Sequence, residues 1–193
     1  MKKRVPAKYY TAIGRVASAW AMFELHINFT IWELANVQQQ HGACITAQIL
    51  APVPRFKALV ALFQLRGASE TAIGKINGLA GTANDLANKR NRLVHDASFI
   101  VPATGVFQQL RITADRKLDF GLVPVSIEEI DEIERRIRKL IKDTGKAIQD
   151  AIDGLPPYDK TQFELSEGVG LNRRKGPSIG RRARRRQRPP SPP

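Results

Sequence analysis

Apolar residues recur every three to four positions over four segments of the sequence, and this period predicts α-helices. The expected helices span residues 9–35, 54–66, 69–95 and 126–153. Each segment carries one apolar stripe, and such stripes leave water by packing against one another. The sequence therefore predicts a mostly α fold with a shared core.

Local signals mark where these helices begin and end. Ser126 and Glu129 have the spacing of a capping box, in which each side chain bonds the backbone at the helix start. Pro54 suits a first turn, and Gly67 suits the position just beyond a helix end. Gly154 is expected to end the last helix, followed by two prolines.

The segment before the last helix, residues 98–125, lacks helical periodicity and is rich in β-branched and aromatic residues. The expected strands are 99–101, 106–112 and 118–123. Turn-forming residues separate them at 102–105 and 114–117. These features predict a small β-meander inserted before the closing helix.

Basic residues concentrate at the C-terminal end. The net charge is +13, and residues 171–193 hold nine lysines and arginines and no acidic residue. We expect an N-terminal extension at 1–8, a helical domain at 9–154, and a disordered Pro- and Arg-rich tail at 155–193. The residues of the tail expected to contact nucleic acid are Arg173, Arg174, Lys175, Arg181, Arg182, Arg184, Arg185, Arg186 and Arg188.

The basic tail has two interpretations. Residues 171–193 contain no aromatic side chain, so they can bind phosphates but cannot stack on bases. They would then raise affinity without sequence preference. Alternatively, they form a solvated low-complexity end with no partner.

The cysteine content and the hydropathy pattern predict where in the cell the protein is found and whether it binds a metal or cofactor. Cys44 is the single cysteine, so the chain cannot form an internal disulfide. The sequence has no apolar run long enough to cross a bilayer, and we expect a cytoplasmic protein with no membrane association. No Cys/His spacing fits a zinc site and no Gly-rich loop fits a phosphate cofactor, so neither metal nor cofactor is expected.

Two charged residues fall on apolar stripes. Glu24 lies near the centre of the first stripe, and Arg90 lies on the apolar side of the third helix. Buried charges need partners, so we expect Glu24 and Arg90 to form an ion pair. Asn91 and His95 are four residues apart and therefore share a helix face.

An arginine, an asparagine and a histidine at one helix end have the chemistry to engage a phosphodiester. Arginine presents a planar fork of donors to phosphate oxygens. Histidine titrates near neutral pH and can transfer a proton in the cell. In RNA the neighbouring 2′-hydroxyl supplies the nucleophile, so such a site needs no metal.

The string Arg90-Asn91-Arg92-Leu93-Val94-His95 resembles the Arg-polar-x-x-x-His motif of HEPN domains. The order of elements from residue 8 to 152 is also similar. The resemblance implies an antiparallel helical bundle and a metal-independent endoribonuclease of the kind found in toxin–antitoxin and phage-defence systems. It further implies a homodimer, RNA as substrate, and an antitoxin or other operon-encoded partner. Arg90 and His95 would be catalytic with Asn91, Glu24 would support them, and Arg92 would contact nucleic acid.

Two other functions remain open. Some HEPN relatives keep the fold without catalysis, which would leave a non-catalytic RNA-binding module. Arg90 could also serve only as the ion-pair partner of Glu24 in a protein-interaction bundle. Exposure of His95 separates these interpretations, because catalysis requires an accessible histidine.

Overall fold

Helices dominate the described part of the chain, residues 5–115 and 117–157, in the computed structural model. The helices are α1 (Ala7–Leu34), α2 (Gln39–Thr46), α3 (Pro52–Leu65), α4 (Glu70–His95) and α5 (Ile127–Asp153). A three-stranded antiparallel sheet lies between α4 and α5 in the chain, with β1 (Ser98–Ile100), β2 (Phe107–Asp115) and β3 (Lys117–Pro124) in that order. The mostly α fold and the meander are confirmed. The predicted tail from residue 158 onward lies outside the described residues.

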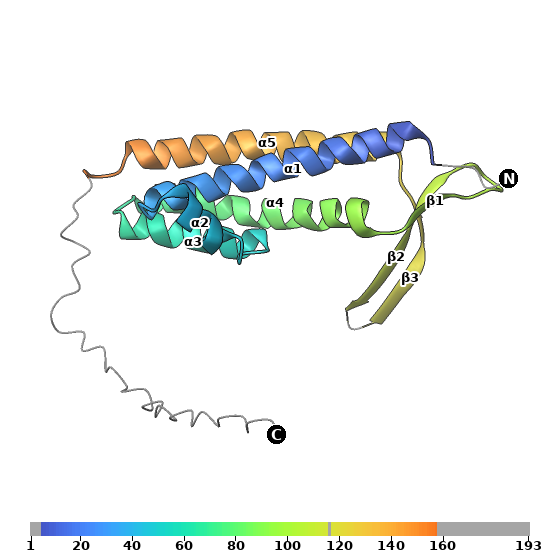
Figure 1. The fold of residues 1–193 in the computed structure, drawn as a ribbon, viewed down its shortest axis with the longest axis horizontal. Coiled ribbons are helices and arrows are strands. Elements are labelled where there is room, and N and C mark those ends of the chain that lie inside the picture. Colours follow the sequence, from blue (N-terminus) through green and yellow to red (C-terminus); the bar gives the residue numbers. More distant parts are fainter. Residues whose placement is uncertain (1–4, 116, 158–193) are drawn as a thin grey trace, which may run out of the picture. The chain divides into compact units, whose positions relative to one another are not determined.

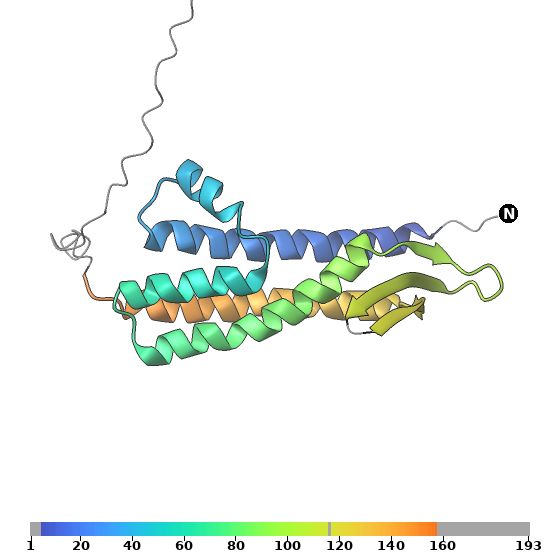
Figure 2. The ribbon, with the colours of Figure 1, turned by 90° about the horizontal axis from the view of Figure 1, so that it is seen from below.

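Three long helices, α1, α4 and α5, lie side by side along the length of the molecule (Figure 1). The shorter α3 covers one half of this group and contacts α4 and α1 (Figure 2). As the chain colours show, α4 runs antiparallel to α1 and α5, whereas α1 and α5 run in the same direction (Figure 1). The end of α4 and the beginnings of α1 and α5 therefore meet at the end of the bundle that carries the sheet.

The apolar stripes of the four main helices form one core, as the sequence predicts. Trp20 and Phe23 of α1 are buried beside Phe56 of α3, with their rings in contact. Fully buried side chains from all four helices fill the rest, among them Val16, Ile27, Leu59, Phe63, Ile76, Leu86, Ile137 and Leu140. This continuous core fixes the positions of the helix ends at which the candidate site lies.

Most of the predicted helix ends are confirmed, but α1 begins at Ala7 instead of residue 9, and α3 begins at Pro52 instead of Pro54, which still lies in the first turn. The Ser126 hydroxyl accepts a hydrogen bond from the Glu129 amide, and the Glu129 carboxylate accepts one from the Ser126 amide. Gly67 follows α3 with φ of 80°, a conformation that glycine adopts at little cost. Ser69 caps α4 by accepting a hydrogen bond from the amide of Ala72.

The helix α2 was not predicted from the sequence. Residues 36–54 lie outside the helices that the periodicity predicts and contain a glycine and two prolines, which interrupt helices, yet Gln39–Thr46 is helical. A tertiary contact accounts for it: the Trp32 indole donates a hydrogen bond of 3.1 Å to the buried Thr46 hydroxyl. Gly42 packs directly on the Trp32 ring, where a larger side chain would collide.

Charged groups also join α1 to α5. Arg15 Nε donates a 2.8 Å hydrogen bond to Glu134 on α5, and its Nη2 donates to Asp131 one turn earlier. The hydrogen bond from Arg15 lowers the pKa of the Glu134 carboxyl, and Arg138 lowers it further. The Glu134 side chain is 12% exposed and the Arg15 side chain 43% exposed, so solvent partly screens this pair and its contribution to stability is modest.

We expect Glu134→Gln to reduce the free energy of unfolding by about 1 kcal/mol near neutral pH, because charged hydrogen bonds to Arg15 and Arg138 are lost. A carboxyl whose pKa is lowered by folding stabilises the protein above its unfolded pKa, and this contribution disappears as the pH falls through the folded pKa. The difference between wild type and variant should therefore shrink below about pH 4.5 in urea titrations. Asp131→Asn, at a more exposed partner of Arg15, is the matched control. A difference that stays constant with pH would contradict this assignment.

Candidate nucleic-acid interface

The last turns of α4 carry the motif residues predicted from the sequence. Arg90 is half-buried, whereas Asn91 and His95 are exposed. Arg90 Nη1 donates a hydrogen bond of 2.8 Å to the side-chain oxygen of Asn91. The helix ends at His95, and Asp96 takes up an extended conformation that leads into β1.

Helix geometry determines which motif side chains share a face. Residues four apart are separated by about 40° around the axis and residues five apart by about 140°. Asn91 and His95 therefore lie on one face, and Arg90 starts from another. The hydrogen bond to Asn91 draws the Arg90 guanidinium toward the face that carries His95. The structure thus brings Arg90 and Asn91 together, and within the described residues no hydrogen bond links either side chain to His95.

The predicted ion pair between Glu24 and Arg90 is wrong. Glu24 is half-buried on α1, as expected, but its carboxylate accepts a hydrogen bond from Arg55 Nη1 at the start of α3. Arg55 is a better partner because its side chain is only 11% exposed and would otherwise be a buried, uncompensated charge. Glu24 thus has a structural role between α1 and α3, not a direct contact with the motif.

The guanidinium of Arg90 consequently has no carboxylate partner among the residues that the structure describes. Its Nε atom is buried and has no hydrogen-bond acceptor there. A half-buried cation with an unused donor is costly unless an anion or polar group binds to it. A purely structural ion pair with Glu24 is therefore not the explanation for Arg90.

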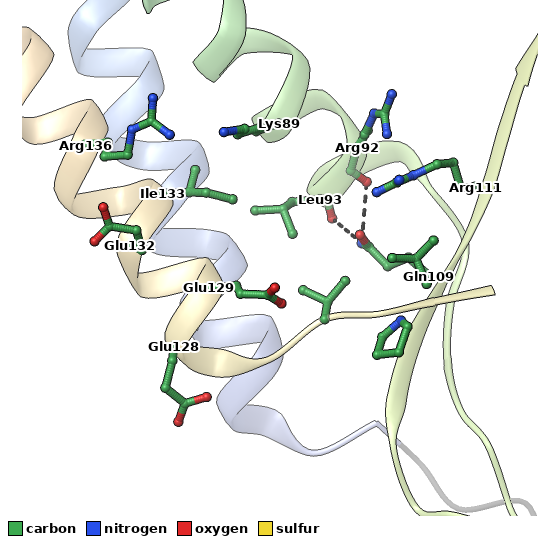
Figure 3. Close-up of a pocket in the computed structure, with 13 residues that line it drawn as sticks. Lys89, Arg92, Leu93, Gln109, Arg111, Glu128, Glu129, Glu132, Ile133 and Arg136 are labelled. Carbon is green, nitrogen blue, oxygen red and sulfur yellow. Dashed lines mark hydrogen bonds between the residues drawn. The ribbon is translucent and has the colours of Figure 1, made fainter. Parts of the chain in front are cut away.

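A hollow of about 530 Å³ lies beside the motif, between the end of α4, the sheet and the start of α5 (Figure 3). Lys89 and Arg92 of α4, Arg111 of β2 and Arg136 of α5 contribute cationic side chains. Three glutamates line the side formed by α5, namely Glu128, Glu129 and Glu132. We call Lys89, Arg92 and Arg111, on α4 and β2, the cationic wall of the hollow, whereas α5 contributes the three glutamates together with Arg136.

Ion pairs leave two of these cations without a carboxylate. Lys89 and Arg136 share Asp85, at 3.2 and 3.1 Å. Among the ion pairs of residues 5–115 and 117–157, none involves Arg92 or Arg111. Both are half-buried and face the same hollow. Two cations with no carboxylate of the described chain within ion-pair distance favour an anion on their side of the hollow, which the glutamates of α5 line from the other side.

Gln109 fixes the position of the sheet against the end of α4. Its side-chain nitrogen donates to the backbone oxygens of Arg92 and Leu93, at 3.4 and 3.3 Å (Figure 3). The last carbonyls of a helix lack partners within the helix, so Gln109 supplies a donor to the Leu93 carbonyl. The Arg92 carbonyl also accepts a hydrogen bond of 3.0 Å from the Asp96 amide. The hydrogen bonds from Gln109 place Arg111, two residues further along β2, on the same side as Arg92.

Sequence reasoning identified Arg92 but not Gln109, Arg111 or Arg136. The only local signal was the alternation of polar residues at 109, 111 and 113 with apolar residues at 110, 112 and 114. That pattern predicts two chemically different faces but does not say which face meets the helices.

No group of three or more histidine, cysteine, aspartate or glutamate side chains in the described ranges could hold a metal ion. No helix there is both long and apolar enough to cross a bilayer. Comparisons with protein-family models, curated proteins and solved structures gave no match.

Proposed function

We propose that this protein is a metal-independent endoribonuclease of HEPN type that acts on RNA as a homodimer, in a toxin or phage-defence role. One observation carries the proposal: Arg90 has no carboxylate partner among the described residues and lies five residues before an exposed histidine at the same helix end. An arginine retained only for packing would be expected to pair with a carboxylate. An exposed His95 meets the requirement for a residue that exchanges protons with a substrate.

In the proposed reaction the 2′-oxygen of a ribose attacks the adjacent phosphorus atom while the bond to the 5′-oxygen of the next nucleotide breaks. The 2′-hydroxyl loses a proton and the departing 5′-oxygen gains one. His95 performs one of these two transfers, and a second base or water performs the other. Arg90, held by Asn91, stabilises the charge that develops on the phosphate oxygens. The products are a 2′,3′-cyclic phosphate and a 5′-hydroxyl.

The cationic wall extends this site. Arg92 lies three residues before His95, about 60° around the helix, so a phosphate chain that reaches His95 passes close to Arg92. Arg111 continues the positive surface onto β2. Such contacts bind phosphates without reading bases, which predicts affinity for many RNA sequences.

Incubation of the full chain with end-labelled single-stranded RNA and the matching DNA, in EDTA, tests the proposal. We expect cleavage of RNA alone, because DNA lacks the 2′-hydroxyl, and no inhibition by the chelator. Product ends should carry cyclic phosphates, which acid opens to 2′- and 3′-monophosphates. Cleavage of DNA at a similar rate, or complete inhibition by EDTA, would contradict the mechanism.

A non-catalytic RNA-binding module is the second candidate, and the pair Arg92 and Arg111 favours it. Both cations face the hollow without a carboxylate partner in the described ranges, yet neither belongs to the expected catalytic pair. RNA binding that is strongly salt-dependent, with no cleavage of any RNA tested, would select this function.

A further inference from the structure

In a typical sheet that packs on helices, the apolar face meets the helices and the polar face meets water. In this sheet the apolar face points away from the helices. Phe107 and Gln109 of β2 point toward the helices, where Phe107 stacks on Tyr9 of α1 and Gln109 bonds α4. Both are buried, at 1% and 5% exposure. Because side chains alternate along a strand, Leu110 and Ile112 must point away from the helices.

The outward face is almost entirely apolar. Register places Leu110 opposite Leu122, Ile112 opposite Phe120, and Ala114 opposite Leu118, so all six share this face. Phe99 of β1 adds to it, since its partner is Gln108. The exposed fractions are 58% for Ile112, 69% for Leu118, 64% for Phe120 and 48% for Leu122. We call Phe99, Leu110, Ile112, Leu118, Phe120 and Leu122 the outer sheet face.

We propose that the outer sheet face is a dimerisation surface whose partner is the same face of a second copy of this chain. Figure 1 shows the far ends of β2 and β3 projecting beyond the helices, so a second molecule can approach them. Contiguous apolar side chains at this exposure are typical of protein interaction sites.

The chemistry of the face favours a second copy over a different partner. No position on it, from β1, β2 or β3, is charged. A surface without charge is complementary to itself, so a twofold contact brings no like charges together. A nucleic acid or an acidic or basic protein would find no counter-charge there.

Face-to-face packing is also the arrangement that removes the most apolar area. Pairing two molecules edge to edge through β3 would satisfy backbone groups but leave both apolar faces in water. Face-to-face packing, at the usual sheet separation, buries them. The exposed parts of these side chains amount to about 450 Å² on each copy, so two copies bury about 900–1,000 Å², near the lower limit for a biological interface. A reversible dimer with micromolar affinity is therefore expected.

The surface is close to the candidate site. Phe99 is four residues beyond His95, and an extended chain covers at most about 3.5 Å per residue, so their Cα atoms are within about 14 Å. A dimer formed by the outer sheet face would hold the two motif-bearing helix ends near one interface. The inference rests on the homodimer of the proposed function and names its contact surface. A monomer would overturn both, whereas cleavage of RNA is a separate measurement.

Sedimentation equilibrium of the full chain, without RNA, tests the proposal with the paired variant Ile112→Thr/Phe120→Thr. Threonine favours strands, so the hairpin should keep its structure while losing apolar area. We expect wild type to dimerise at micromolar concentration and the variant to dissociate at least about tenfold more readily. Helix content by circular dichroism should be unchanged, because the outer sheet face does not contact the core.

Leu50→Thr is the matched control, since Leu50 is an apolar side chain of comparable size that is 85% exposed, just before α3. It should leave the dimer intact. Wild type that stays monomeric up to about 100 µM, well above the micromolar range, would overturn the proposal. A dimer that withstands the paired variant, or that Leu50→Thr weakens equally, would overturn it too, because the contact would then lie elsewhere.

Discussion

Replacing His95 with alanine should reduce RNA cleavage by about 10²–10⁴-fold, the usual contribution of a group that transfers a proton in the transition state. RNA binding should change little, because His95 is one exposed side chain beside several cations. Cleavage rates from single-turnover assays and dissociation constants from filter binding, at one fixed salt concentration, separate the two effects.

His41→Ala provides the control for this experiment. His41 is also exposed, but it lies on α2, away from the motif in the chain. Its replacement should leave the cleavage rate unchanged. Cleavage that survives His95→Ala would show that another group transfers the proton. Equal loss in both variants would indicate a general effect on the fold instead of chemistry at His95.

The second large effect concerns stability. Glu24→Gln should lower the free energy of unfolding by about 3 kcal/mol, because it leaves the buried guanidinium of Arg55 without its counter-charge. We place the loss at the low end of the usual 3–5 kcal/mol, since the Glu24 side chain is 30% exposed. Urea titration should show a lower midpoint with an unchanged slope.

Two variants sharpen this prediction. Glu33→Gln changes an exposed glutamate on the same helix that takes part in none of the ion pairs of the described residues, and it should alter stability by less than about 0.5 kcal/mol. The variant Arg90→Ala should also have a urea midpoint near that of wild type, because Glu24 forms its ion pair with Arg55 and not with Arg90. If Arg90→Ala were as destabilising as Glu24→Gln, the two residues would be coupled, contrary to the observed pairing.

Periodicity predicted most of the fold because burial follows it closely. Most residues of the apolar stripes of α1, α3, α4 and α5 are buried or half-buried, and the capping signals of Ser126 and Gly67 coincide with the helix ends. Helix α2 escaped prediction because its stability depends on Trp32 and Thr46, which are fourteen residues apart. A single contact between distant residues produces no periodic pattern of apolar residues, so the sequence alone does not reveal it.

The candidate site was predicted only in part. Exposure of His95 and the pairing of Arg90 with Asn91 agree with a site at the end of α4. The partner of Glu24 was misassigned because two arginines compete for one carboxylate, and only the packing of α3 decides between them. The orientation of the sheet was equally undetermined, since strand alternation is identical for either face.

The Arg15–Glu134 bond has a consequence for how the chain is made. It joins residues 119 positions apart, and the helices that it links are the first and last of the described chain. During synthesis at about 5–20 residues per second, α1 waits roughly ten seconds before α5 leaves the ribosome. Throughout that interval the apolar stripe of α1 lacks one of its packing surfaces. The nascent chain is thus a candidate for chaperone capture, and folding of the described helical domain is completed only when α5 emerges.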